Sequence, residues 1–300
     1  MALSLVGWWW LDDARGHHTV GSSPYESPPV TAFRLRIAGH GIELLFPDDS
    51  LATSIQERYG GFTTSDTPDT RIEVRFPRHL QPVADAGVPW ALCAADTIRF
   101  GRNDLHAETD ASFHEVHVEM RSLVYTLDAL LRIFCSIFLI RRGGVLLHAA
   151  AVGTDGRGVA FAGPTESGKS ELSHMQYGTH LTDELSPVRP DTNGFTVYGS
   201  PFWGLFERGG HNVGLPLCAL FLLARGQTRI EPVGRIQAVQ GTMRCVLNFS
   251  REPAVVDQVM STVSRLITAV PCARLVSPPD MALWPLVADF ASQRSRLTTG

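Results

Sequence analysis

The feature that most constrains this chain is the segment Gly163 to Ser170, which reads Gly-Pro-Thr-Glu-Ser-Gly-Lys-Ser and matches the Walker A pattern in full. It follows an apolar run, Val159 to Ala162, and precedes a segment where a helix is expected to begin at about Gly168. Glycines in such a loop let backbone N–H groups approach phosphate oxygens closely. The alternative is a chance glycine-rich turn before a helix. We favour a phosphate-binding loop because pattern and context agree.

The distribution of basic residues supports this interpretation. Of the 26 lysines and arginines, Lys169 is the only lysine, which leaves 25 arginines. A planar guanidinium replaces a flexible ammonium poorly against β- and γ-phosphates. The sequence therefore predicts that ATP binds this segment and that the Ser170 hydroxyl ligates Mg²⁺. The predicted nucleotide-binding residues are Gly163, Pro164, Thr165, Glu166, Ser167, Gly168, Lys169, Ser170 and Glu171.

Two carboxylates, Asp183 and Glu184, lie 14 and 15 residues after Lys169, where the next strand is expected to end. One carboxylate of such a pair can hold Mg²⁺ and the other can accept the proton of an attacking hydroxyl. Acidic pairs are also common on solvated loops, but the position after a strand favours a functional site. His148 lies in an apolar run 21 residues before Lys169. Considered alone, it is more simply a core histidine.

The pattern of apolar residues divides the chain near residue 120. Short alternating runs separated by Gly, Pro and Asp predict a β-rich N-terminal region over residues 1–120. A helix is expected at about 121–142, ending at Gly143-Gly144. The expected strands of the N-terminal region are Phe33 to Ile37, Ile42 to Phe46, Arg71 to Phe76, Thr97 to Phe100 and His114 to Glu119.

The second region, residues 121–300 including that helix, has a different pattern. Val145 to Val152 and Val159 to Ala162 are apolar without alternation, as strands buried on both faces are. We therefore predict an α/β P-loop nucleotide-binding core. Its further expected elements are strands at 196–198, 217–223 and 228–232 and a helix at about 253–269.

Composition excludes several classes of protein. A net charge of −4 gives no reason to expect a nucleic-acid or membrane partner. Five scattered cysteines indicate free thiols in a cytoplasmic protein rather than a disulfide framework or a zinc site. The apolar run with Trp8, Trp9 and Trp10 lacks the flanks of a signal peptide, so we expect it to pack on the fold or at a subunit contact. Leu123 to Ile140 contains Asp128 and Arg132, which favours a buried helix over a membrane span.

These residues together resemble the HPr kinase/phosphorylase family, which is related to the phosphoenolpyruvate carboxykinases. The resemblance is carried by His148 on a strand, a glycine-containing hairpin, the Gly-Lys-Ser-Glu end of the loop and the Asp183-Glu184 pair. It is specific over about 148–187, loose to about 285, and does not cover the first 120 residues. Pro164 stands where the family often has Asp, and Glu184 replaces an Asp. The chain is more similar to divergent HPr-kinase-like proteins that accompany peptide-modification systems.

The resemblance implies a core of the HPr kinase/phosphoenolpyruvate-carboxykinase type and an ATP-dependent kinase. The resemblance implies that the acceptor is a hydroxyl, namely a serine of a small protein or peptide. The protein could also form a homo-oligomer. By resemblance, Asp183 is the general base, Glu184 serves Mg²⁺, His148 lies near the phosphates, and Glu207 helps to bind metal. Glu207-Arg208-Gly209 is also an ordinary turn. The alternatives are a small-molecule kinase, a regulator that binds nucleotide without phosphotransfer, and a structural protein with a vestigial loop.

Overall fold

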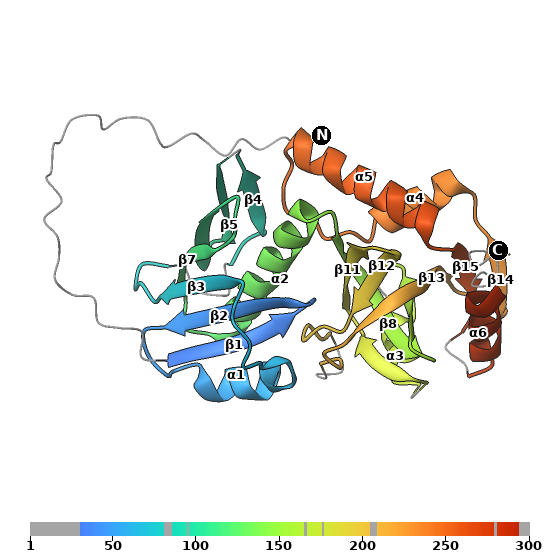
Figure 1. Ribbon diagram of the computed structural model, residues 1–300, viewed down its shortest axis with the longest axis horizontal. Helices are drawn as coiled ribbons and strands as arrows, with labels where there is room; N and C mark the ends of the chain where they lie inside the picture. Colours follow the sequence, from blue (N-terminus) through green and yellow to red (C-terminus); the bar gives the residue numbers. More distant parts are fainter. Residues whose placement is uncertain are drawn as a thin grey trace, which may run out of the picture.

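The computed structural model describes residues 31–80, 86–94, 96–164, 167–175, 177–204, 209–278 and 281–293. Within these ranges, only the backbone is described at residues 170, 173, 174 and 293. The predictions for Trp8, Trp9 and Trp10 therefore lie outside the described residues. Figure 1 shows a seven-stranded sheet at one end of the molecule, a second sheet at the other, and the long helix α2 between them.

The first sheet is built from strands whose side chains alternate between the core and solvent. In β6, Leu105, Ala107 and Thr109 are buried and the residues between them are exposed, as the two-residue period of a strand requires. The strand order is β1-β2-β3-β7-β6-β5-β4. Helix α1 (Ala52–Tyr59) and the short helix η1 (Gly60–Phe62) follow β2. The strands are β1 (Thr31–Ile37), β2 (His40–Phe46), β3 (Thr70–Arg75), β4 (Trp90–Cys93), β5 (Thr97–Arg102), β6 (Leu105–Asp110) and β7 (Glu115–Met120).

Helix α2 (Val124–Arg141) confirms the helix predicted at about 121–142. It is buried on most sides because it packs against strands of both sheets, including β5, β8 and β11. The helix ends where predicted: Gly143 has a φ of +73°, and the N–H of Gly144 donates to the carbonyl of Leu139 at 2.8 Å. Among the described residues, none of the helices is both long and apolar enough to cross a membrane.

The second sheet contains a closed ring of five strands. β8 pairs with β11, β11 with β12, β12 with β13, β13 with β9, and β9 with β8 again. β15 and β14 extend the sheet from β13, and β10 continues beside β8. The strands are β8 (Val145–Thr154), β9 (Arg157–Ala162), β10 (Thr179–Thr182), β11 (Leu185–Asp191), β12 (Gly194–Tyr198), β13 (Gly214–Ala224), β14 (Arg229–Pro232) and β15 (Cys272–Val276).

In the described residues that follow β8, the chain forms four helices. Helix α3 (Lys169–His174) follows β9, and helices α4 (Arg235–Met243), α5 (Pro253–Ala269) and α6 (Leu283–Gln293) follow later. The helix predicted at about 253–269 is α5, which begins at Pro253, a residue suited to the first helical turn. Valines and a leucine on one face of α5 enter the core beside the ring. Figure 1 shows α4 and α5 along one edge of this half and α6 at its end.

The predicted fold class, an α/β P-loop nucleotide-binding core of the HPr kinase/phosphoenolpyruvate-carboxykinase type, is wrong. The observed fold is β-rich: a mixed sheet closes into a ring, and among the described strands of that sheet only β9, β13 and β15 are paired in parallel. The apolar runs in β8 and β9 misled the prediction because they are buried on both faces in either architecture. Closure is tight at Gly158, where a Cβ atom would lie 2.2 Å from Cγ1 of Val197. Apolar periodicity reports burial, and it does not distinguish parallel from antiparallel pairing.

Candidate functional site

The register of β8 brings sequence-distant residues to one place. Ala149 pairs with Ala162, the last residue of β9, so the glycine-rich loop leaves the sheet beside it. The preceding residue, His148, pairs with Leu185, which directly follows the acidic pair. The backbone N–H of His148 also donates to the carbonyl of Cys245 at 2.6 Å. The loop, the histidine and the acidic pair therefore meet at one end of β9.

The acidic pair interrupts a strand path along β8. β10 has a register shift between His180 and Thr182. After it, Thr182 pairs with Ala151 and Leu185 with His148, so the end of β10 and the start of β11 share one register and the acidic pair lies between them. The Thr182 hydroxyl accepts hydrogen bonds from the backbone N–H groups of Glu184 and Leu185, each at 3.2 Å. These bonds fix the turn in which both carboxylates sit.

The carboxylate of Asp183 is buried, with the residue 1% exposed. It accepts from the backbone N–H of Gly204, at 3.4 Å to Oδ1 and 3.3 Å to Oδ2. A Cβ atom at Gly204 would lie 3.5 Å from Oδ2 of Asp183 and 3.6 Å from Cδ of Glu184. The segment that ends at Gly204 therefore packs directly against the acidic pair.

In the loop, Lys169 begins helix α3 directly after Gly168, whose φ of +94° suits glycine. Lys169 is 6% exposed, and its ammonium donates to the carbonyls of Gly163 at 2.9 Å and Pro164 at 2.8 Å. Burial lowers the pKa of Lys169. The ammonium is thus held by the two carbonyls at the start of the loop.

Several predicted ligands are not described. Thr165, Glu166 and Glu207, and the side chain of Ser170, lie outside the described part. Within the described part, no group of three or more His, Cys, Asp or Glu side chains could hold a metal ion. Of the predicted metal ligands Ser170, Glu184 and Glu207, only Glu184 can therefore be placed.

His148 is half-buried, and the charge of Lys169 in the loop acts on its imidazole. Burial lowers its pKa, and the positive charges of Lys169 and Arg132 lower it further. The imidazole is therefore neutral at pH 7, and a neutral ring can accept or donate a hydrogen bond. Cys245 lies near the same ammonium: burial raises the pKa of its thiol, while Lys169 acts in the opposite direction.

Glu184 has a partner that the sequence reasoning missed. Burial raises the pKa of the Glu184 carboxyl, and Arg132 of helix α2 opposes this through a hydrogen bond of 3.0 Å from Nη1 to Oε2. Arg132 also pairs with Asp128 at 2.6 Å. From the sequence, these two charges indicate only that the helix is buried rather than membrane-spanning. Their spacing of four residues within an apolar helix was a signal for a buried ion pair.

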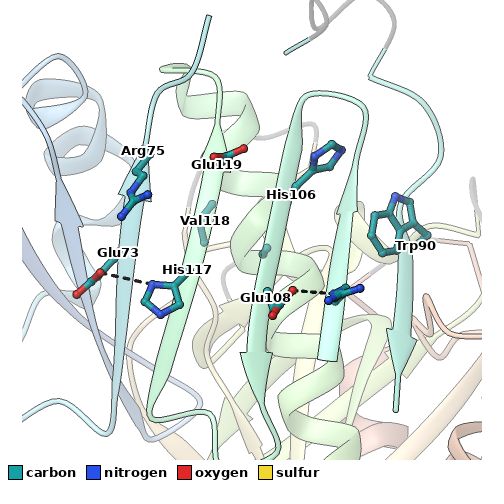
Figure 2. Close-up of a pocket in the computed structure, with 10 residues that line it drawn as sticks. Glu73, Arg75, Trp90, His106, Glu108, His117, Val118 and Glu119 are labelled. Atoms are coloured by element: carbon teal, nitrogen blue, oxygen red, sulfur yellow. Dashed lines mark hydrogen bonds and ion pairs between the residues drawn. The ribbon is translucent and has the colours of Figure 1, made fainter. Parts of the chain in front are cut away.

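A hollow of about 690 Å³ lies apart from these residues, on the outer face of the first sheet. Figure 2 shows Glu73, His117, Glu119, His106 and Trp90 projecting from neighbouring strands on this face. Opposite charges there pair with each other, as Arg99 and Glu108 do at 2.6 Å. The hollow contains none of the residues that the sequence singled out.

The sequence matches no protein-family model and no curated protein. The resemblance to HPr kinases therefore rests on the residues named above.

Proposed function

We propose that this chain is an ATP-dependent phosphotransferase that moves the γ-phosphate to a hydroxyl group, with a serine of a small protein or peptide as the acceptor. The observation that carries the proposal is the meeting of Lys169, His148 and the Asp183-Glu184 pair at the end of β9. The proposal stands on this local arrangement and on the sequence resemblance to HPr kinases, and it does not depend on the fold class.

The residues fit a magnesium ion. Mg²⁺ in nucleotide sites is usually held by one or two carboxylates together with substrate phosphates and water, so a cage of three protein carboxylates is not needed. Asp183 and Glu184 are adjacent carboxylates in a buried turn, which is suitable chemistry. Glu184, with Ser170, would hold the ion. When bound, Mg²⁺ would neutralise charge on the phosphates.

The remaining roles follow from charge and position. Lys169 places a compact positive charge where the loop surrounds phosphate, once its ammonium exchanges the carbonyls of Gly163 and Pro164 for phosphate oxygens. Asp183, which is buried and accepts long hydrogen bonds from Gly204, takes the proton of the acceptor hydroxyl. His148, neutral beside Lys169, offers a hydrogen bond to the phosphate region. The five free thiols suit a cytoplasmic protein.

Transfer of labelled γ-phosphate from ATP tests the proposal, with the proteins and peptides encoded beside this chain as acceptors. Asp183→Asn keeps the shape of the side chain but removes the base, so turnover should fall by about 10²- to 10⁴-fold. Nucleotide affinity should change far less. The matched control is Asp110→Asn, at the exposed end of strand β6 in the first sheet.

The outcomes of this experiment distinguish the roles of Asp183 and the alternative functions of the protein. Near-normal transfer by Asp183→Asn would remove Asp183 from the role of base. Nucleotide binding without transfer by the parent protein would favour the regulator, and labelling of a small alcohol alone would favour a small-molecule kinase. Equal loss of binding and turnover in Asp183→Asn would make Asp183 a metal ligand.

A further inference from the structure

A network of buried charges connects helix α1 to the acidic pair. Asp128 of α2 accepts from Nε of Arg58 at 2.9 Å and from the Tyr59 hydroxyl at 2.9 Å, both of them on α1. Its other oxygen accepts from Nε of Arg132 at 2.6 Å. Nη1 of Arg132 then donates to Glu184 at 3.0 Å. The side chains of Arg58 and Arg132 are each 20% exposed and that of Asp128 is 10% exposed.

A second path runs through the segment that covers the acidic pair. Nη2 of Arg132 donates to the carbonyl of Trp203 at 3.1 Å. The guanidinium of Arg58 lies over the Trp203 ring, 4.1 Å from its centroid. The next residue, Gly204, donates its N–H to Asp183. Arg132 is therefore linked directly to one acidic residue and through a single peptide unit to the other.

The geometry of Arg132 needs an arginine. Its three guanidinium nitrogens have three different partners: Nε binds Asp128, Nη1 binds Glu184 and Nη2 binds the Trp203 carbonyl. The planar, fixed fork of a guanidinium can hold three acceptors in set directions, and a single ammonium on a flexible stem cannot.

We propose that Arg132 is the positioning residue of the acidic pair, and that α1 fixes Arg132 through Arg58 and Asp128. Arg132 sets the direction of the Glu184 carboxylate. Through the Trp203 carbonyl, it also holds the N–H of Gly204 in position to donate to Asp183. Helix α1, which follows β2 of the first sheet, thereby becomes part of the support of the phosphotransfer site. This inference rests on the proposed function for its catalytic meaning, but the positioning itself can be measured separately.

The kinetic test compares Arg132→Gln and Arg132→Lys with Arg141→Gln as a matched control. Arg141 is at the end of the same helix and donates to the carbonyl of Ala94, away from the site. Loss of a residue that orients a metal ligand typically costs 10- to 100-fold in metal affinity or activity. We expect Arg132→Gln to raise the Mg²⁺ concentration for half-maximal turnover by about tenfold or more. Arg132→Lys should restore only part of this, and the control should match the parent.

A double-mutant cycle with Glu184→Gln distinguishes positioning from general support of the fold. If Arg132 acts through Glu184, Arg132→Gln should change the Mg²⁺ requirement much less in the Glu184→Gln background than in the parent. Additive effects on the Mg²⁺ requirement, or a parent-like curve for folded Arg132→Gln, would overturn the proposal. Arg58→Gln serves as the second variant if Arg132→Gln fails to fold, since loss of the Arg58 contact with Asp128 should shift the curve in the same direction.

Hydrogen exchange separates this inference from the proposed function. In Arg132→Gln, the amide of Gly204 should exchange faster than in the parent and the control, because the Trp203 carbonyl has lost its partner. Unchanged exchange would overturn the positioning role even if the protein is a kinase. Faster exchange in a protein that neither binds nor turns over ATP would refute the proposed function and leave the structural link standing.

Discussion

The outer face of the first sheet and the acidic site both contain many charged groups, but the groups pair in different ways. On the outer face, Arg99 and Glu108 are cross-strand partners in the β5–β6 register, and their side chains are 62% and 53% exposed. At the site, Arg132 and Glu184 come from a helix and a turn that lie 52 positions apart, and both are mostly buried. Strand alternation alone places the first pair together. Only the tertiary fold assembles the second, so buried pairs of this kind are the stronger evidence for a functional site.

The largest effect on stability is expected at Asp128, the centre of the network of buried charges. Asp128→Asn removes the carboxylate that two guanidiniums share, and removing one partner of a buried ion pair typically costs about 3–5 kcal/mol. We expect about 3 kcal/mol here, because both arginines keep some exposure to solvent. Denaturant unfolding measures the loss. A variant as stable as the parent would show that the buried ion pairs contribute as little to the free energy of unfolding as the exposed pairs of the outer face.

Acid should reveal a second difference between buried and exposed groups. Burial lowers the pKa of His40 from 6.5 to about 4, against the opposing charge of Asp69. The unfolded chain therefore binds this proton more readily, and the stability from a neutral His40 is complete above pH 6.5 and is lost as pH falls to about 4. The loss should reach about 3 kcal/mol.

His40→Gln should flatten this part of the stability curve between pH 6.5 and 4, as followed by denaturant unfolding at each pH. His106→Gln, on the exposed outer face, is the control and should keep the slope of the parent because it leaves His40 in place. Equal slopes in all three proteins would exclude His40 as the source.

The smallest effect is expected on the outer face. Glu108→Gln breaks the Arg99 pair, but exposed ion pairs contribute about 0–1 kcal/mol. The midpoint of denaturant unfolding should therefore move little, and less at high salt. A loss comparable to that of Asp128→Asn would remove the distinction between the two regions.

Local features of this chain were predictable because their causes are local. The extents of α2 and α5 and the strands around residues 33–46 follow from apolar spacing, Gly143 and Pro253. Short elements without strong patterns, such as α1 and β4, were missed. The ring of strands could not be inferred, since burial on both faces has the same sequence pattern in antiparallel and parallel strands.

For the candidate site, the sequence allowed the functional residues to be selected but not the contacts that position them. Lys169, Asp183 and Glu184 could be selected because their residue types and spacing suit phosphate and metal chemistry. Arg132 could not be assigned to Glu184, because that pairing depends on how α2 lies against the β10–β11 turn. The contact of Gly204 with Asp183 has the same origin, and no sequence motif marks it.

Modification of Lys169 tests the central claim, a working phosphate site, most directly. The single lysine and the N-terminal amine are the primary amines of this chain, so an acylating reagent can be followed at one side chain by peptide mass analysis. ATP with Mg²⁺ should protect Lys169, because the phosphates would engage its ammonium. Acylation without nucleotide should abolish turnover, because it removes the positive charge. Equal labelling rates with and without saturating nucleotide, or full turnover by the acylated protein, would contradict the account.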